Sequence, residues 1–418
     1  MKILISAVGD TDPIRNFHDG PLLHIVRVYR PEKIVLVHSE RSLTKHDKLV
    51  KALKSIKDYS PEIIQDGGVL QDAKVAIFDE MYDTVSSIVK KYISDDEIIL
   101  NISSATPQII SAMFAVNRIS DFNVTAVQVL TPQHKSNEGL RHDNQEDIDT
   151  LIETNLDNQS DYENRTLEDT GMKFSLDLTK RNLKALIDNY DYQGALELLR
   201  ALKLPKKQES FSNIKELRKK LTEISDTIKI QGMPDKIVKA KLSTKAQSAL
   251  NSYLNIDRNH KQGNIAEVLI RVKSLVEFIL ENYLNNHFLD VITYKEDGKP
   301  FLNASKYPEI LKKFQEDAKM RDQEYHSGYL SLPAYIDILK YLEPEPKNDL
   351  LKHIYEIQKI NQVRNQVAHS LQAFDRKNLK KVSSAVFASK QILLASFDID
   401  NHWFSFYEDL NQEIKKLL

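Results

Sequence analysis

The sequence lacks cysteine and has no long apolar run. The absence of cysteine excludes disulfides, cysteine-ligated zinc and a cysteine nucleophile, and gives no sign of an oxidising compartment. No apolar run approaches the roughly 18 residues of a membrane-spanning helix, and the apolar stretch at residues 2–8 is too short for a signal-peptide core. We therefore expect a soluble, cytoplasmic protein that does not associate with membranes.

Neither sign of charge dominates, because 58 Lys and Arg residues face 60 Asp and Glu residues and the net charge is −2. Any contact with nucleic acid must then come from local patches. The two common nucleotide-binding fingerprints, G-x-G-x-x-G and Walker A, are also missing. A chain of 418 residues is long enough for about two domains, each with its own core.

The first third of the chain alternates short apolar runs with helical patterns. We expect buried strands at Lys2–Val8, Lys33–Ser39, Glu97–Ile102 and Asn123–Leu130, and a shorter one at Ile63–Gln65. Strands that are apolar throughout and alternate with helices predict a parallel α/β sheet covered on both faces. Ligands of such sheets bind beyond the carboxyl ends of the strands.

Two loops follow strands at that edge, and we call residues 9–15 and 101–108 the ligand loops. The first reads G-D-T-D-P-I-R, and the second reads N-I-S-S-A-T-P-Q. Thr106 has the character of a helix N-cap and Pro107 that of a first helical residue, so free backbone N–H groups there suit an anion such as a phosphodiester. The alternatives stay open that Thr106 only caps its helix and that Asp12 only makes a turn.

The chain changes character after the last predicted strand. Residues 131–171 are polar and acidic, and we interpret them as an insertion or linker with one helix near Glu146–Thr154. Met172–Leu178 alternates apolar and polar residues, which predicts a strand at the edge of the sheet. From residue 179 to residue 418 the pattern is helical. We therefore expect an α/β domain over 1–178 and an all-α region over 179–418.

A second candidate site lies on one amphipathic helix near the C-terminus. Its apolar positions recur three or four residues apart, without Pro or Gly, at Leu350, Ile354, Ile357, Ile360, Val363, Val367 and Leu371. Arg364, Asn365 and His369 come off this helix. The same Arg-to-His spacing occurs at Arg41 and His46, which we interpret as solvated surface, and at Arg321 and His326, near a helix end.

These three residue types suit cleavage of RNA, which carries its own nucleophile in the 2′-hydroxyl and needs no metal. Histidine, with a pKa near 6.5, exchanges protons at neutral pH. We expect His369 to move the proton, Arg364 to hold the scissile phosphate, and Asn365 to orient one of them. A C2 dimer would supply a second histidine. The alternative is that His369 is an ordinary packed or surface histidine.

Taken together, the motifs G-D-T-D-P-I-R-x3-D-G-P-L-L-H-I at 9–25, S-S-A-T-P-Q at 103–108 and R-N-Q-V-A-H at 364–369 resemble the CARF–HEPN ribonucleases of type III-A CRISPR systems. The resemblance covers essentially the whole chain. It implies a Rossmann-like CARF sensor that binds cyclic oligoadenylate and an all-α HEPN domain that cleaves single-stranded RNA. The ligand-binding positions carried over are Gly9, Asp12, Arg15, Ser103, Ser104, Thr106 and Gln108, and the catalytic ones are Arg364, Asn365 and His369.

The resemblance also implies a homodimer with a composite HEPN site, 2′,3′-cyclic phosphate products, no metal or other cofactor, and no stable association with the interference complex. The extended first motif is most similar to that of members activated by cyclic hexa-adenylate rather than tetra-adenylate, and some members also cut the ring in the CARF domain. Two other functions remain open: a toxin-type HEPN ribonuclease, and a ligand-binding regulator without catalysis.

Overall fold

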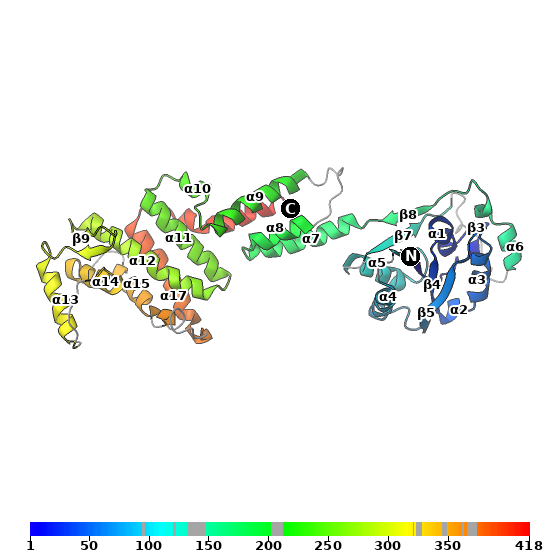
Figure 1. Ribbon diagram of the computed structural model, residues 1–418, viewed down its shortest axis with the longest axis horizontal. Helices are drawn as coiled ribbons and strands as arrows, with labels where there is room; N and C mark the ends of the chain where they lie inside the picture. The colour runs from blue at the N-terminus through cyan, green and yellow to red at the C-terminus, as the bar shows by residue number, and fades with distance from the viewer. Residues whose placement is uncertain are drawn as a thin grey trace. The chain divides into compact units, whose positions relative to one another are not determined.

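The computed structural model describes residues 1–93, 97–119, 123–132, 147–201, 212–320, 322, 328–344, 349–361, 363–365 and 374–418. The chain forms two compact units, Met1–Asp177 and Leu178–Leu418. The first is built on a sheet and the second on helices (Figure 1). Within the described part of the chain, no helix combines the length and the apolar character needed to span a bilayer.

A six-stranded sheet in the order β5-β4-β1-β6-β7-β8 forms the first unit. Its strands are β1 (Lys2–Ala7), β4 (Lys33–Ser39), β5 (Glu62–Leu70), β6 (Glu97–Asn101), β7 (Val124–Val129) and β8 (Thr166–Asp169). Neighbouring strands pair in parallel except β7 and β8, which are antiparallel. This confirms the predicted α/β class, and the predicted strands coincide with β1, β4, β6 and β7 within a residue or so.

Helices cover both faces of the sheet because its strands are apolar on both sides (Figure 1). Ile3, Ile5 and other residues of one strand face pack against α4 (Phe78–Tyr92) and α5 (Pro107–Ile119). Leu4 and the residues of the opposite face pack against α1 (Pro21–Tyr29), α3 (His46–Lys54) and α6 (Ile148–Glu153). Successive side chains of a strand point to opposite faces, so the continuous apolar runs account for two core layers.

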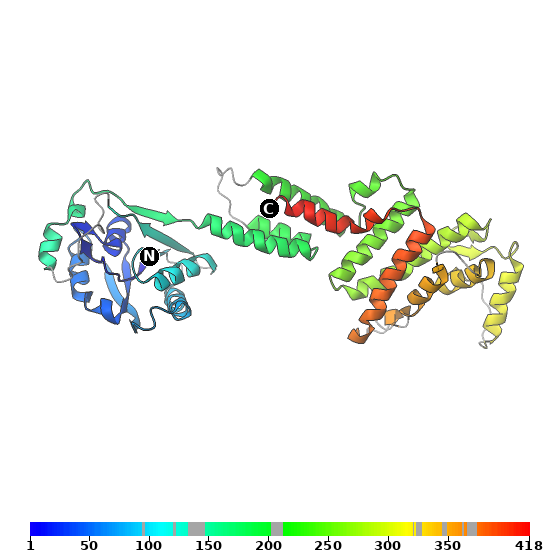
Figure 2. The same cartoon turned by 180° about the vertical axis from the view of Figure 1, so that it is seen from behind.

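The predicted edge strand at Met172–Leu178 is wrong, since Met172–Asp188 forms helix α7 and the edge strand is β8. Figure 2 shows β8 leading into α7. The strand ends where the Asp169 carboxylate accepts a hydrogen bond from the backbone of Gly171 at 2.9 Å and pairs with Arg118 of α5 at 2.8 Å. The alternating apolar residues that suggested a strand stay partly exposed, Phe174 at 44%.

The acidic segment predicted as an insertion or linker is in part an integral piece of the first unit. Residues 133–146 lie outside the described residues, but 147–169 contribute α6, the short helix η1 (Leu156–Asn158) and β8. The helix expected near Glu146–Thr154 is confirmed as α6. Asn155, Asp157 and Arg165 are buried at 4%, 3% and 5% exposure. They are buried because they pair with polar residues of the α1 region, as described below.

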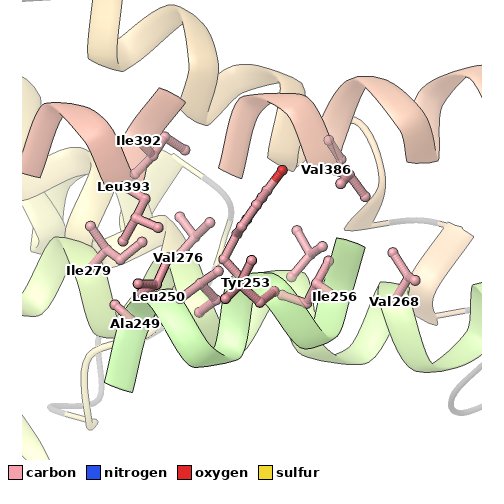
Figure 3. Packing of buried hydrophobic residues seen from close by; sticks show 14 of the residues in the cluster. Ala249, Leu250, Tyr253, Ile256, Val268, Val276, Ile279, Val386, Ile392 and Leu393 are labelled. Atoms are coloured by element: carbon pink, nitrogen blue, oxygen red, sulfur yellow. The ribbon is translucent and has the colours of Figure 1, made fainter. Parts of the chain in front are cut away.

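The second unit packs its helices around one apolar core. The helices are α8 (Tyr192–Ala201), α9 (Ser212–Lys229), α10 (Asp235–Val238), α11 (Thr244–Lys261), α12 (Ile265–His287), α13 (Pro308–Met320), α14 (Leu332–Leu342), α15 (Leu350–Gln358), α17 (Leu379–Ser396) and α18 (Phe406–Lys415). Figure 3 shows Tyr253 of α11 among residues of α12 and α17. The helical class is confirmed, with one addition: β9 (Ile292–Tyr294) and β10 (Pro300–Leu302) form a small hairpin.

The helix predicted to carry the C-terminal motif is not continuous. It ends as α15 at Gln358, a turn follows at 359–360, and helical residues resume at 361 and 363–365. The apolar seam is nevertheless buried as predicted at Leu350, Ile354, Ile357, Ile360 and Val363. Val367, His369 and Leu371 lie outside the described residues.

Candidate ligand-binding and catalytic sites

The two ligand loops lie at the carboxyl edge of neighbouring strands. β1 has β4 on one side and β6 on the other, so the chain's winding direction reverses between β1 and β6. The crevice at such a switch point is where open α/β sheets bind ligands. The loop after β1 and the loop after β6 flank this crevice, as the sequence predicted.

Gly9 lets the two ligand loops touch. A Cβ atom at this position would lie 2.4 Å from the Ser104 hydroxyl oxygen and 3.1 Å from the backbone nitrogen of Ala105. Ala105 itself has a positive φ of 144°, a backbone conformation that L-residues rarely adopt. Any side chain at residue 9 would therefore push the loops apart, which explains why glycine stands here.

Asp12 fastens the first ligand loop from within. Its carboxylate accepts hydrogen bonds from the Ser104 hydroxyl, from the backbone of Gly9 at 2.9 Å and from the backbone of Leu22 at 3.0 Å. Burial raises the pKa of this carboxyl, against the lowering effect of those hydrogen bonds. At 4% exposure, Asp12 shapes the loop in the way that the turn-making alternative requires.

Thr106 caps α5 and is one of the residues that line the cavity described below. Its hydroxyl accepts from the backbone of Ile109 at 3.4 Å and donates to the carbonyl of Val75 at 3.0 Å. Helix α5 begins at Pro107, as predicted from the sequence. The start of this 13-residue helix therefore presents backbone N–H groups and the positive end of its dipole to the crevice.

The other predicted ligand residues lie at varying depths around this point. The Ser103 hydroxyl accepts from the backbone of Val129 at 2.7 Å and so fixes the end of β7. Ser104 is buried at 2% exposure beneath Gly9. Arg15 lies in a short hairpin made by β2 (Ile14–Arg15) and β3 (His18–Asp19), and Gln108 lies in the first turn of α5; both are partly exposed.

A cavity of about 480 Å³ opens at this edge of the sheet. Gly9 and Thr106 line it, as do the polar residues Asp10, Ser39, Arg41, Ser42 and Asp72, over an apolar floor of Ala7, Val8, Val37, Val75, Ala105, Pro107 and Ile109. Asp12, Arg15, Ser103, Ser104 and Gln108 do not line it. Sequence reasoning missed Arg41, although this residue follows directly on the carboxyl end of β4, where the strand-end rule also applies.

A buried ionic cluster lies beside the first ligand loop. Asp19 binds Arg27 of α1, with Oδ1 3.0 Å from Nη2, and Arg165 donates to Asp157 at 2.8 Å. The ring nitrogen Nε2 of His24 accepts from the backbone of Arg165 at 3.0 Å. Asp19, His24 and Asp157 could hold a metal ion by their spacing, but two guanidinium groups already neutralise both carboxylates. The cluster therefore serves to dock residues 155–165 onto α1.

Arg364 and Asn365 are the described residues of the predicted C-terminal site. The backbone nitrogen of Arg364 donates to the carbonyl of Ile360 at 2.8 Å, so Arg364 sits in helical geometry beside the buried Val363. Its Nη1 lies 3.3 Å from the side-chain oxygen of the exposed Asn365. Its buried Nε has no hydrogen-bond partner among the described residues. A partly satisfied guanidinium held beside an exposed amide is suited to receive a phosphate.

Comparison with known proteins matches both units to family models. Residues 62–166 match the model described as the Cas_Csm6 CARF domain, and residues 237–415 match the Cas_Csm6 HEPN domain. The chain is 40% identical to the CRISPR system endoribonuclease Csm6′ of Streptococcus thermophilus over 99% of this chain and 98% of that protein. A second Csm6 from the same organism is also 40% identical, with full coverage of both chains.

A solved structure matches the whole chain as well. It is described as Enterococcus italicus Csm6 bound to cyclic hexa-2′-fluoro-hexa-dAMP. The TM-score is 0.71 and the sequence identity 33%, and the match covers 100% of each chain.

Proposed function

The chain belongs to the Csm6 family of CRISPR endoribonucleases, and we propose that residues 1–178 sense cyclic oligoadenylate and thereby switch on cleavage of single-stranded RNA by residues 179–418. The observation that carries this proposal is the placement of both ligand loops at the switch point, around a polar cavity at the start of α5. An anionic nucleotide ring matches that environment.

The ring contacts we propose divide into two groups. Gly9 and Thr106 contact the ring directly, because they line the cavity. Asp12 and Ser104 hold the two loops in register beneath it, since the Ser104 hydroxyl donates to the Asp12 carboxylate and that carboxylate also accepts from the backbone of Gly9. Arg15, Ser103 and Gln108, at the margins of the site, remain proposed contacts for the parts of a ring that extend beyond the cavity.

We favour cyclic hexa-adenylate over tetra-adenylate as the activator. The structure of the related Enterococcus italicus protein, which aligns over the whole of this chain, contains a cyclic analogue made of six nucleotides. Cleavage of the ring in the first unit is a further proposed activity. Its candidate participant is Thr106, which is a hydroxyl-bearing residue among those that line the cavity.

For RNA cleavage we propose a metal-independent transesterification. Arg364 holds the scissile phosphate and its developing charge, Asn365 orients the phosphate or His369, and His369 transfers the proton. The Nη1 of Arg364 lies 3.3 Å from the side-chain oxygen of the exposed Asn365, which supports a phosphate contact made by these two neighbouring residues. A homodimer would bring two copies of this motif together and provide both an acid and a base. No stable contact with the interference complex is required, and we place the activity in the cytoplasm.

The test is cleavage of a fluorescent single-stranded RNA in EDTA, with cyclic tetra-, penta- and hexa-adenylate added separately. We expect strong stimulation by cyclic hexa-adenylate, products ending in 2′,3′-cyclic phosphate, and a dimer by light scattering. His369→Ala should abolish cleavage and leave the dimer intact. No stimulation of clean dimers by any ring would refute the sensor function and favour the toxin-type ribonuclease.

A further inference from the structure

Arg41 lines the cavity at the carboxyl edge of the sheet, where its side chain forms an exposed ion pair with Asp10. Its Nη2 is 3.2 Å from the Asp10 carboxylate, and the two side chains are 69% and 53% exposed. Exposed ion pairs of this kind contribute little to stability. Among the described residues that line the cavity, Arg41 is the one with a cationic side chain.

Lys45, the other cation nearby, is committed to the protein itself. Its ammonium group donates to the carbonyl of Gly9 at 3.3 Å and to the carbonyl of Asp10 at 3.0 Å, and its side chain is 10% exposed. It also lies 3.7 Å from the Asp10 carboxylate. Asp10 therefore keeps a cationic neighbour if Arg41 leaves.

We propose that Arg41 exchanges Asp10 for a phosphodiester of the ring when the activator binds. This inference rests on the proposed function, since it names a further residue of the same site. The guanidinium leaves a solvated ion pair, which has a hydrogen bond of 3.2 Å, and can bind a phosphodiester through two parallel charge-assisted hydrogen bonds instead. Asp10 opposes binding in the free protein because it competes for Arg41, and Lys45 neutralises it afterwards.

The exchange predicts effects of opposite sign at the two partners. Arg41→Gln removes the guanidinium that binds the phosphate and should raise the dissociation constant for cyclic hexa-adenylate about tenfold. It should also reduce the dependence of binding on salt, by about 0.7 in the logarithmic slope for each phosphate that the protein no longer neutralises. Asp10→Asn keeps the shape of the side chain but releases Arg41, so it should lower the dissociation constant by about threefold.

The experiment is isothermal titration calorimetry of the full-length chain with cyclic hexa-adenylate, which gives the dissociation constant at several salt concentrations. Lys51→Gln is the matched control, because Lys51 also forms an exposed ion pair, with Asp149, yet does not line the cavity. The control should bind as the wild type does. Opposite shifts for the two variants, with a reduced slope for Arg41→Gln alone, would support the exchange.

Three results would count against the exchange, and they are distinguishable. If the wild type binds the ring and Arg41→Gln binds it equally well with the same salt slope, the exchange is overturned while the sensor function stands. If Asp10→Asn weakens binding, Asp10 is a contact rather than a competitor, and the exchange is likewise overturned. If the wild type binds no ring, the proposed function fails and this inference falls with it.

Discussion

Replacing Asp157 by Ala tests whether the buried ionic cluster holds the first unit together. The substitution leaves the guanidinium of Arg165, which is 5% exposed, without its carboxylate at 2.8 Å. It also removes the acceptor for the backbone N–H of Asp19, at 2.8 Å. Breaking a buried pair by deleting one partner costs about 3–5 kcal/mol, because the remaining charge is uncompensated. A domain has only about 5–15 kcal/mol to lose.

The chain offers a built-in way to see which unit is affected. Its single tryptophan, Trp403, lies in the second unit, so tryptophan fluorescence follows that unit during urea unfolding, while circular dichroism follows both. With a urea dependence of roughly 2 kcal/mol per molar, the midpoint of the first unit should fall by about 2 M. The fluorescence midpoint should stay where it is in the wild type.

Asp161→Ala is the matched control, because Asp161 belongs to the same segment but is exposed. It should change neither transition by more than about 0.5 kcal/mol. Asp157→Asn, which keeps an acceptor and loses the charge, should fall between the two. If Asp157→Ala unfolds like Asp161→Ala, the cluster contributes no net stability and residues 155–165 are anchored by other contacts.

The same structure supports three further predictions. Gly171→Ala should destabilise the first unit more than Gly68→Ala. Both glycines have a positive φ, which costs a non-glycine residue about 1–2 kcal/mol, but of the two only Gly171 would place the new methyl group on a neighbour, 1.7 Å from the Arg118 guanidinium. Equal urea midpoints for the two variants would contradict this prediction. Acid should destabilise the first unit as pH falls below about 4. Burial would raise the pKa of Asp157, but hydrogen bonds from His24 and the Asp19 backbone and the charge of Arg165 hold this pKa below its usual range. The stabilisation by Asp157 is therefore present at neutral pH and is lost as the carboxyl protonates. A shallower acid transition in Asp157→Asn, followed by circular dichroism, checks this, and an unchanged transition would refute it. Arg364→Gln should lower ring-stimulated RNA cleavage about 10²- to 10³-fold while the calorimetric affinity for the ring stays constant; retained cleavage would exclude Arg364 from the catalytic site.

Local sequence predicted the parts of the fold that depend on local patterns. The strand at Lys33–Ser39 is apolar at most interior positions, and the structure has it with the same bounds. Thr106 and Pro107 mark the start of α5 because capping is decided within a few residues. Such signals need no knowledge of the partner that a segment packs against.

Where partners distant in sequence decide the outcome, the prediction was wrong or incomplete. Met172–Leu178 alternates like a strand, yet α7 forms there, and the edge strand β8 ends at Asp169, which pairs with Arg118 from about 50 residues earlier in the chain. The polarity of the segment around Asp157 and Arg165 was interpreted as that of an insertion or linker, whereas these residues pair with the α1 region. Arg41 was assigned to the solvated surface, and its side chain is 69% exposed, but the sequence did not show that it pairs with Asp10 at the cavity.

The charges around the cavity bear on how the proposed sensor would distinguish its activator from other adenine nucleotides. Two carboxylates, Asp10 and Asp72, share this lining with one guanidinium, Arg41. A nucleoside triphosphate concentrates several negative charges at one end, and among the described residues that line the cavity Arg41 alone has a cationic side chain to offset them. A cyclic phosphodiester spreads its charges singly around its circumference. We therefore expect this edge to favour a ligand with dispersed negative charge over a nucleoside triphosphate.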